Sequence, residues 1–153
     1  MEEAMSTTET NTTPMSDAEL AELFNTLLEC ERAGVKVLTE YEKDFAGNDE
    51  AVHTIVESRR DEGKYCKLMF DFLRELGADI SPRTGSFADK ALAVEGKAER
   101  LAFLNRGQGW VAREIEKALP RIDRPHMREA LQEMLDTHRD NIGRTDELID
   151  GLS

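Results

Sequence analysis

Apolar residues recur at helical spacing over four stretches of the chain. These stretches span residues 16–46, 49–76, 86–119 and 123–152. Within each stretch the apolar side chains follow one another at intervals of three or four residues, which places them on one face of a helix. No segment alternates between apolar and polar residues over a useful length, so the pattern predicts four amphipathic helices and no β-sheet.

Residues typical of helix ends bound these stretches. Ser16 and Glu19 form a capping-box pattern before the first helix, and Gly77 stands just beyond the second, where a left-handed residue often ends a helix. The other expected end signals are Asp49 as the cap of the second helix, Pro120 at the end of the third, and Asp123 with Pro125 at the start of the fourth.

The helical pattern predicts an all-α fold, an antiparallel four-helix bundle over residues 16–153. Four long helices joined by short connections usually lie beside one another in an up-and-down order. Residues 1–15 contain five threonines and a proline and have little apolar surface to bury, so we expect a disordered N-terminal tail there.

The balance of acidic and basic residues limits the kinds of partner that we expect this protein to bind. The chain has 32 acidic and 20 basic residues and a net charge of −12, which argues against nucleic-acid binding. No apolar run approaches the roughly 20 residues of a membrane-spanning helix, and the acidic, polar N-terminus does not resemble a secretory signal. We therefore expect a cytoplasmic protein that binds neither nucleic acid nor membrane.

Polar residues interrupt the apolar row near the middle of every predicted helix. In chain order they are Glu31 on the first helix, Arg59 and Glu62 on the second, Gln108 on the third, and His138 and Asn141 on the fourth. Other positions of these rows are almost all apolar, so one shared polar layer explains the pattern better than four unrelated substitutions.

The heights of these residues along the helices agree. Glu31 lies 17 residues before the turn near residue 48 and Glu62 lies 14 residues after it, so their heights differ by about 4 to 5 Å. Gln108 and His138 lie 14 residues before and 16 residues after the turn near residue 122. If the second and third helices form a simple hairpin, all four residues lie in one layer.

Two buried carboxylates need a neutralising group, because burying a charge costs several kcal/mol. The sequence leaves three possible neutralising groups open. The first is one divalent metal ion (Fe, Mn or Zn) bound by Glu31, Glu62 and His138. The second is the counter-ion Arg59, one turn before Glu62, and the third is a proton on one of the carboxyl groups. Gln108 is expected to position other groups, since neutral amides are weak ligands for transition metals. We expect Asn141 and Arg59 to lie beside the site, and Tyr65 and Cys66 to be further candidates for its surroundings or for a ligand pocket.

Glycines flank the predicted layer on three helices, at Gly34, Gly63, Gly107 and Gly109. A glycine inside a helix costs about 1 kcal/mol relative to alanine. Such positions favour close backbone approach, a kink, or room for a ligand.

Two further pairs are candidates for a role. Counted from the turn near residue 48, Cys30 and Cys66 are predicted to lie at the same height along their helices. Both are expected to be inert buried thiols. Phe103 and Trp110 form a second apolar row on the third helix. The linker or a neighbouring helix can cover this row, and the alternative is a homodimer surface.

Three segments of the chain, LLECERAG, RRDEGKYC and EMLDTHRDNI, resemble the ferritin-like superfamily, in particular its small bacterial members. The resemblance spans Ser16 to Leu152. In the di-iron proteins of that superfamily two helices each supply one Glu, and the other two each supply a Glu-x-x-His pair. Glu31 matches the Glu of the first helix, Glu62 the Glu of the second-helix pair, and His138 the histidine of the fourth.

The chain departs from the superfamily pattern at three ligand positions. Tyr65, followed by Cys66, stands in place of the second-helix His; Leu135 replaces the fourth-helix Glu; and Gln108 lies near the level of the third-helix Glu. Three of the six ligands are kept. The resemblance therefore implies a ferritin-like fold with a degenerate interior site, holding a mononuclear centre or a small-ligand pocket instead of a di-iron centre.

Three hypotheses about function follow. The leading one is a ferritin-like bundle whose interior site binds one divalent metal ion or a small ligand. The second is a non-catalytic interaction or structural protein, in which the buried polar layer only fixes helix packing. The third is an enzyme that acts on a small organic molecule in the same cavity, with Glu31 or Glu62 as general base. The sequence identifies no substrate.

Overall fold

The computed structural model describes residues 12–152, and over that range it contains helices and no strand. Its five α-helices are α2 (Asp17–Glu42), α3 (Asp49–Glu75), α4 (Phe87–Ala93), α5 (Lys97–Ala118) and α6 (Pro125–Gly151). The short 3-10 helices η1 (Lys43–Phe45) and η2 (Leu119–Arg121) follow α2 and α5. The prediction of an all-α fold is confirmed for this part of the chain.

The expected N-terminal tail, residues 1–15, lies mostly outside the described residues. Its last residues contact the end of η2: the backbone N–H of Met15 donates to the carbonyl oxygen of Arg121 at 2.8 Å, and the Arg121 guanidinium donates to the carbonyl oxygen of Thr13 at 2.8 Å. Met15 also packs against the apolar core. This portion of the expected tail is therefore held against the helices.

Two helix ends form as predicted. The hydroxyl oxygen of Ser16 accepts the backbone N–H of Glu19 at 3.1 Å, and the Glu19 carboxylate accepts the backbone N–H of Ser16 at 3.0 Å, which completes the capping box of α2. Gly77 follows α3 with a φ of 67°, in the left-handed region that favours glycine.

Two predicted caps are wrong by one residue. Asn48, and not Asp49, caps α3, since its side-chain oxygen accepts a backbone N–H of the first turn at 3.1 Å. At the start of α6 the cap position is held by Arg124 and not by Asp123, and no side chain caps it. Pro125 occupies the first turn as predicted, where its missing N–H costs little.

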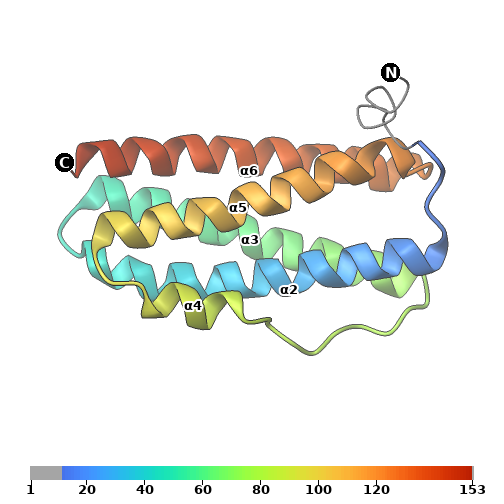
Figure 1. The fold of residues 1–153 in the computed structure, drawn as a ribbon, viewed down its shortest axis with the longest axis horizontal. Helices are drawn as coiled ribbons and strands as arrows, with labels where there is room; N and C mark the ends of the chain where they lie inside the picture. Colours follow the sequence, from blue (N-terminus) through green and yellow to red (C-terminus); the bar gives the residue numbers. More distant parts are fainter. Residues whose placement is uncertain (1–11, 153) are drawn as a thin grey trace, which may run out of the picture.

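The four long helices run along a common axis and form two antiparallel pairs, α2 with α3 and α5 with α6 (Figure 1). Figure 1 also shows that α3 and α5 start at the same end of the molecule, because the connection between them runs back along its length. The simple hairpin expected between the second and third helices is therefore absent from the described residues. The turns near residues 48 and 122 consequently lie at opposite ends.

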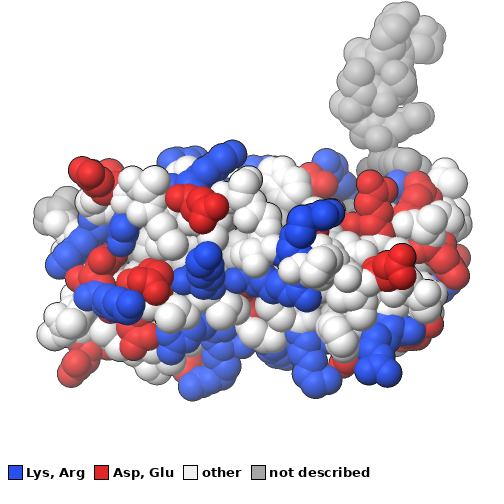
Figure 2. Space-filling model, turned by 90° about the horizontal axis from the view of Figure 1, so that it is seen from below, with Lys and Arg blue, Asp and Glu red and all other residues white. Residues whose placement is uncertain are grey.

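The long connection between α3 and α4, residues 76–86, is fixed to one row of α2. Arg32 donates to the carbonyl oxygens of Ser81 and Arg83 at 2.6 and 3.0 Å, and the Glu29 carboxylate accepts the Ser81 hydroxyl at 2.6 Å. Asn25, one turn earlier, accepts the backbone N–H of Ser81 at 2.8 Å. Figure 2 shows the face of the molecule on which this connection and α4 lie.

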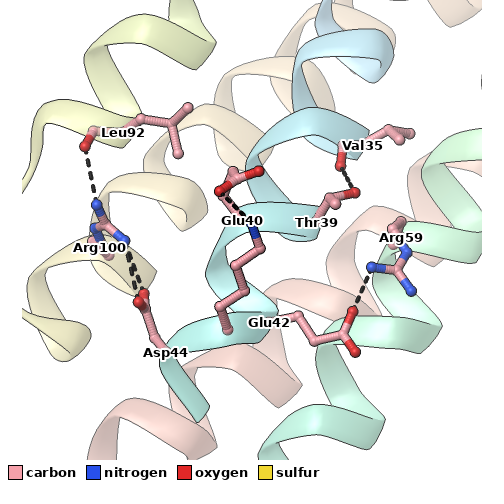
Figure 3. A network of polar contacts seen from close by, with 9 residues as sticks. Val35, Thr39, Glu40, Glu42, Asp44, Arg59, Leu92 and Arg100 are labelled. Atoms are coloured by element: carbon pink, nitrogen blue, oxygen red, sulfur yellow. Dashed lines mark hydrogen bonds and ion pairs between the residues drawn. The ribbon is translucent and has the colours of Figure 1, made fainter. Parts of the chain in front are cut away.

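The third predicted helix is interrupted, so the expectation of one helix over residues 86–119 is wrong. The chain leaves the helix at Val94, which is extended, and passes through Gly96 with a φ of 96°. Arg100 stabilises this break: its guanidinium donates to the carbonyl oxygens of Leu92 and Val94 and pairs with Asp44 at 3.0 Å (Figure 3). The carbonyl groups that a continuous helix would use are satisfied in this way.

The second apolar row of the third predicted helix is partly covered by α4. The ring of Phe103 stacks on that of Phe87, with 5.2 Å between the ring centroids. Trp110 keeps 42% of its surface exposed. Packing within the chain accounts for Phe103, and a homodimer through Phe103 and Trp110 stays a prediction.

Candidate metal centre

A layer of buried polar side chains separates two apolar clusters of the core. One cluster contains residues of the first half of α2 together with the second half of α3, and the other contains the opposite halves. On each long helix, a polar residue separates the residues of one cluster from those of the other; these residues are Glu31, Glu62, Gln108 and His138. Each of them exposes less than 5% of its surface. The predicted interior positions of these four residues agree with the structure.

Three of these side chains meet directly. Nδ1 of His138 lies 2.9 Å from the carbonyl oxygen of Met134, and since a carbonyl only accepts, Nδ1 carries a proton and donates it. Nε2 of His138 lies 3.1 Å from Oε2 of Glu31 and 3.5 Å from Oε2 of Glu62. The three side chains each offer one ligand atom within 4.8 Å of the other two.

The charges of this group are strongly coupled. Burial by itself lowers the pKa of His138, but the negative charge of Glu31, the hydrogen bond to it and the charge of Glu62 together raise that pKa to about 10. Burial, followed by the charge of Glu31, raises the pKa of Glu62 well above its usual value. The site therefore holds a proton when no other cation is bound.

Gly34 makes room for the carboxylate of Glu62. A Cβ atom at this position of α2 would lie 1.8 Å from Oε1 of Glu62 and 2.8 Å from its Cδ. The sequence suggested close backbone approach, a kink or room for a ligand at this glycine, whereas the space is taken by a side chain of α3. Gly63 has open space around it, and an added Cβ at Gly109 would approach only the side chain of Arg113, at 3.3 Å, so neither of these glycines makes room in the same way.

Several buried polar atoms of the layer have no hydrogen-bond partner among the described residues. They are Oε1 of Glu31, Oε2 of Glu62, Oδ1 of Asn141, and both Oε1 and Nε2 of Gln108. A buried polar group without a partner costs about 1 to 3 kcal/mol. Most of these atoms are acceptors, so a cation or a bound donor is the complement that they need.

Tyr65 packs beside the site, and Asn141 lies one turn after His138 on the same helix. The hydroxyl group of Tyr65 bonds to that of Thr137 at 3.0 Å, and the Tyr65 ring lies 6.1 Å from the His138 ring, centroid to centroid. Asn141 is buried and donates to Asp61 at 3.1 Å. Tyr65 thus places an aromatic ring against the imidazole of His138.

Arg59 does not lie at the site, which corrects the expectation that it neutralises Glu62. Its guanidinium is half-buried and pairs with Glu42 at 2.5 Å, near the end of α2 (Figure 3). The buried row of α3 passes through Ser58, Glu62 and Tyr65, so Arg59 is turned away from the core. Among the three solutions for the buried carboxylates, a counter-ion from Arg59 is therefore excluded.

The two cysteines are free, partly buried thiols, and both pack against the same apolar cluster on one side of the layer. Burial, followed by the charges of Glu31 and Glu62, raises the pKa of both Cys30 and Cys66 to about 12. Thiols with so high a pKa are poor nucleophiles and poor metal ligands at neutral pH. This agrees with the expectation of inert thiols.

The donor set fits one divalent metal ion. Metal bonds to imidazole nitrogen and carboxylate oxygen are about 2.0 to 2.2 Å long, which sets neighbouring donors about 3.0 to 3.6 Å apart. The distances of 3.1 and 3.5 Å from Nε2 of His138 lie in this range, and a movement of about 1 Å by one carboxylate brings the whole group into it.

A cavity of about 480 Å³ connects this group to the surface. Its floor includes Glu31, Glu62, Gln108 and His138, and its outer part is lined by residues 84–87 of the long connection and the start of α4. Sequence reasoning did not predict the contribution of this segment. The one available signal was Gly107, at which an added Cβ would lie 2.6 Å from the ring of Phe87.

Comparison with known proteins gives a family and no closer relative. No helix among the described residues is both long and apolar enough to cross a membrane. Neither the curated proteins nor the solved structures include a significant match to the chain. A family model described as a domain of unknown function, DUF6306, matches residues 18–147. Since that range covers most of the chain and contains all three residues of the Glu-Glu-His group, the chain belongs to the DUF6306 family.

Proposed function

We propose that this protein is a ferritin-like bundle that binds one divalent metal ion through Glu31, Glu62 and His138. The observation that carries the proposal is the meeting of these three buried side chains within 4.8 Å of one another, on three different helices. Two carboxylates and a neutral imidazole balance the charge of a divalent cation. The ion replaces the proton that otherwise lies between His138 and Glu31.

The course of the chain supports the ferritin-like part of the proposal. Ferritin-like bundles have one long crossover connection between two helical hairpins, and the segment between α3 and α5 runs along the length of the molecule (Figure 1). Tyr65, Leu135 and Gln108 stand at the other ligand positions of the di-iron pattern. The Tyr65 hydroxyl is bonded to Thr137, Leu135 has no donor atom, and Gln108 offers only a neutral amide, so a single ion is proposed.

Mixed oxygen and nitrogen donors leave Fe²⁺, Mn²⁺ and Zn²⁺ as the candidate ions. Such an ion acts as a Lewis acid toward an oxygen ligand that shares its coordination sphere. The hydrogen bond from Nδ1 of His138 to the Met134 carbonyl fixes the orientation of the ring and leaves Nε2 for the ion.

Metal analysis of protein purified without a histidine tag tests the proposal. We expect about one equivalent of metal, and a rise in melting temperature when Fe²⁺, Mn²⁺ or Zn²⁺ is added to metal-free protein. Glu31→Gln and His138→Ala should each lose the metal. Glu22→Gln and His53→Ala, which change exposed residues of the same types, should keep it. Metal at background level together with no thermal shift would refute the proposal.

A second candidate function is a non-catalytic interaction protein, whose polar layer only fixes helix packing. The observation that favours it is the ion pair of His138 with Glu31, which neutralises part of the layer without a metal. It predicts that replacing Glu31, Glu62 and His138 together by apolar residues preserves or raises stability and keeps partner binding. The metal proposal predicts loss of the thermal shift in the same variant.

A further inference from the structure

The cavity above the Glu-Glu-His group has the size of a small-molecule site. Its volume of about 480 Å³ falls within the range of about 300 to 1,000 Å³ that is usual for ligand pockets. It lies between α2 and α5 and is bounded on the outside by the end of the long connection and α4. A metal ion at its floor would occupy only a small part of this volume.

The walls of the cavity are apolar and partly aromatic. Leu104 and Val111 of α5 line its inner part, and Phe87 and Trp110 lie toward its mouth. Gly107 allows the Phe87 ring to close against α5, since an added Cβ would meet that ring at 2.6 Å. These walls suit a flat apolar body, and aromatic rings favour one another in offset or edge-to-face contact.

One polar side chain inside the cavity lacks any partner. Gln108 exposes 4% of its surface, lines the cavity, and leaves both its amide oxygen and its amide nitrogen without a hydrogen bond among the described residues. Its amide nitrogen offers two N–H donors. A ligand oxygen at the floor would satisfy a group that the protein itself leaves unsatisfied.

The charges around the mouth leave one cation unpaired among the described residues. Glu29 lines the cavity, but its carboxylate accepts the Ser81 hydroxyl and lies 3.9 Å from Nε of Arg83. Lys90 lines the cavity, is exposed, and makes no ion pair with another described residue. Arg32 and Arg83 lie on α2 and on the connection next to it. Figure 2 shows Lys and Arg side chains across the middle of this face, with Asp and Glu side chains mostly toward its two ends. Such a local field attracts small anions.

We propose that the cavity binds a small aromatic monocarboxylate, with its ring between Phe87, Val111 and Trp110 and its carboxylate at the amide nitrogen of Gln108. The inference rests on the proposed metal ion. With a divalent ion bound, the charges of Glu31, Glu62 and the ion cancel and a carboxylate is accepted at the floor. Without the ion, the floor presents the unpartnered acceptor oxygens of Glu31 and Glu62, which offer an anion no hydrogen-bond donor.

The only tryptophan of the chain, Trp110, reports on the cavity by its fluorescence. Protein loaded with stoichiometric Zn²⁺ and metal-free protein are each titrated with 3-phenylpropanoate, and with 3-phenylpropan-1-ol and 3-phenylpropylamine as neutral and cationic probes of the same shape. We expect the zinc form to bind the carboxylate at least tenfold more tightly than either other probe. We also expect its affinity to fall at least tenfold in metal-free protein.

Variants at Gln108 test the proposed contact. Gln108→Leu removes the N–H donors and should weaken 3-phenylpropanoate binding about tenfold, while Gln108→Glu places a like charge at the floor and should abolish it. Zinc content, measured on the same samples, should stay unchanged in Gln108→Leu. Gln132→Leu, an exposed glutamine on α6, should bind the probe as the parent protein does.

The outcomes separate this inference from the metal proposal. Bound zinc together with no fluorescence response to the carboxylate, or with a preference for the alcohol or the amine, would overturn the ligand class and leave the metal site standing. Failure of the parent protein to retain zinc would overturn both proposals. Equal binding of the carboxylate by the parent protein and by Gln108→Leu would overturn the assigned contact.

Discussion

Replacing Gly34 by alanine adds one methyl group at the wall of the proposed metal site. The new Cβ would lie 1.8 Å from Oε1 of Glu62, and contacts under 3.0 Å are essentially never found, so the carboxylate must move by about 1 Å or more. Because this atom is the far end of a flexible side chain, α2 can keep its fold. The carboxylate cannot keep its place beside His138.

Two effects of this substitution oppose each other. Alanine is favoured over glycine inside a helix by about 0.5 to 1 kcal/mol, which by itself stabilises the protein. Displacing Glu62 removes one of three ligands, for which we expect at least a tenfold loss of zinc affinity, equivalent to about 1.4 kcal/mol. Gly34→Ala should therefore weaken metal binding without unfolding the protein.

Gly63→Ala is the matched control for this experiment. Gly63 also lies inside a long helix, is exposed, and has open space where the Cβ would be placed. This variant should gain about 0.5 to 1 kcal/mol in the free energy of unfolding and keep its zinc affinity. Zinc affinity is measured by competition with a coloured chelator, and stability by urea unfolding of metal-free protein. If Gly34→Ala binds zinc within twofold of the parent protein, Glu62 is not a ligand as the structure places it.

Three further changes have defined outcomes. Ser16→Ala should lower the free energy of unfolding by about 1 kcal/mol, measured in urea, because the α2 capping box is lost; no change would mean that the box does not contribute. Tyr41→Phe should lower it by about 1 to 3 kcal/mol, since the Tyr41 hydroxyl donates to the buried carbonyl oxygen of Ala91 at 2.9 Å, and a neutral result would contradict that bond. With a pKa of about 12, Cys30 and Cys66 are protonated at pH 8, so alkylation by iodoacetamide should be slow and accelerate about tenfold per pH unit. Alkylation of folded protein as fast as that of unfolded protein would show that these thiols are not protected.

The polar layer could be predicted from the sequence because its members lie near the midpoints of their helices. The heights of Glu31 and Glu62 were measured from the turn near residue 48, and those of Gln108 and His138 from the turn near residue 122. The comparison assumed that both turns lie at the same end of the molecule. The turns lie at opposite ends, yet the four heights still agree, since a midpoint is equally far from either end (Figure 1). Burial of all four residues followed from the helical period alone.

The errors have local causes. On α3 the apolar period fits a row through residues 59, 62 and 66 nearly as well as the observed row through 58, 62 and 65, and the two differ by one residue. Arg59 was thus placed inside, although its long side chain reaches Glu42. The break at Gly96 was missed because the apolar spacing continues across it and no proline marks it. The direction of the connection between α3 and α5 depends on side-chain bonds to α2, such as those of Arg32, which spacing does not reveal.

The proposed metal site is divided between two helical hairpins, α2 with α3 and α5 with α6. Glu31 and Glu62 belong to α2 and α3, whereas His138 belongs to α6, so an ion held by all three would cross-link the two halves at the buried polar layer. Separation of the hairpins would require release of the ion. The loaded protein should therefore unfold more slowly than the metal-free protein, and cooperatively, even where each hairpin alone is only marginally stable.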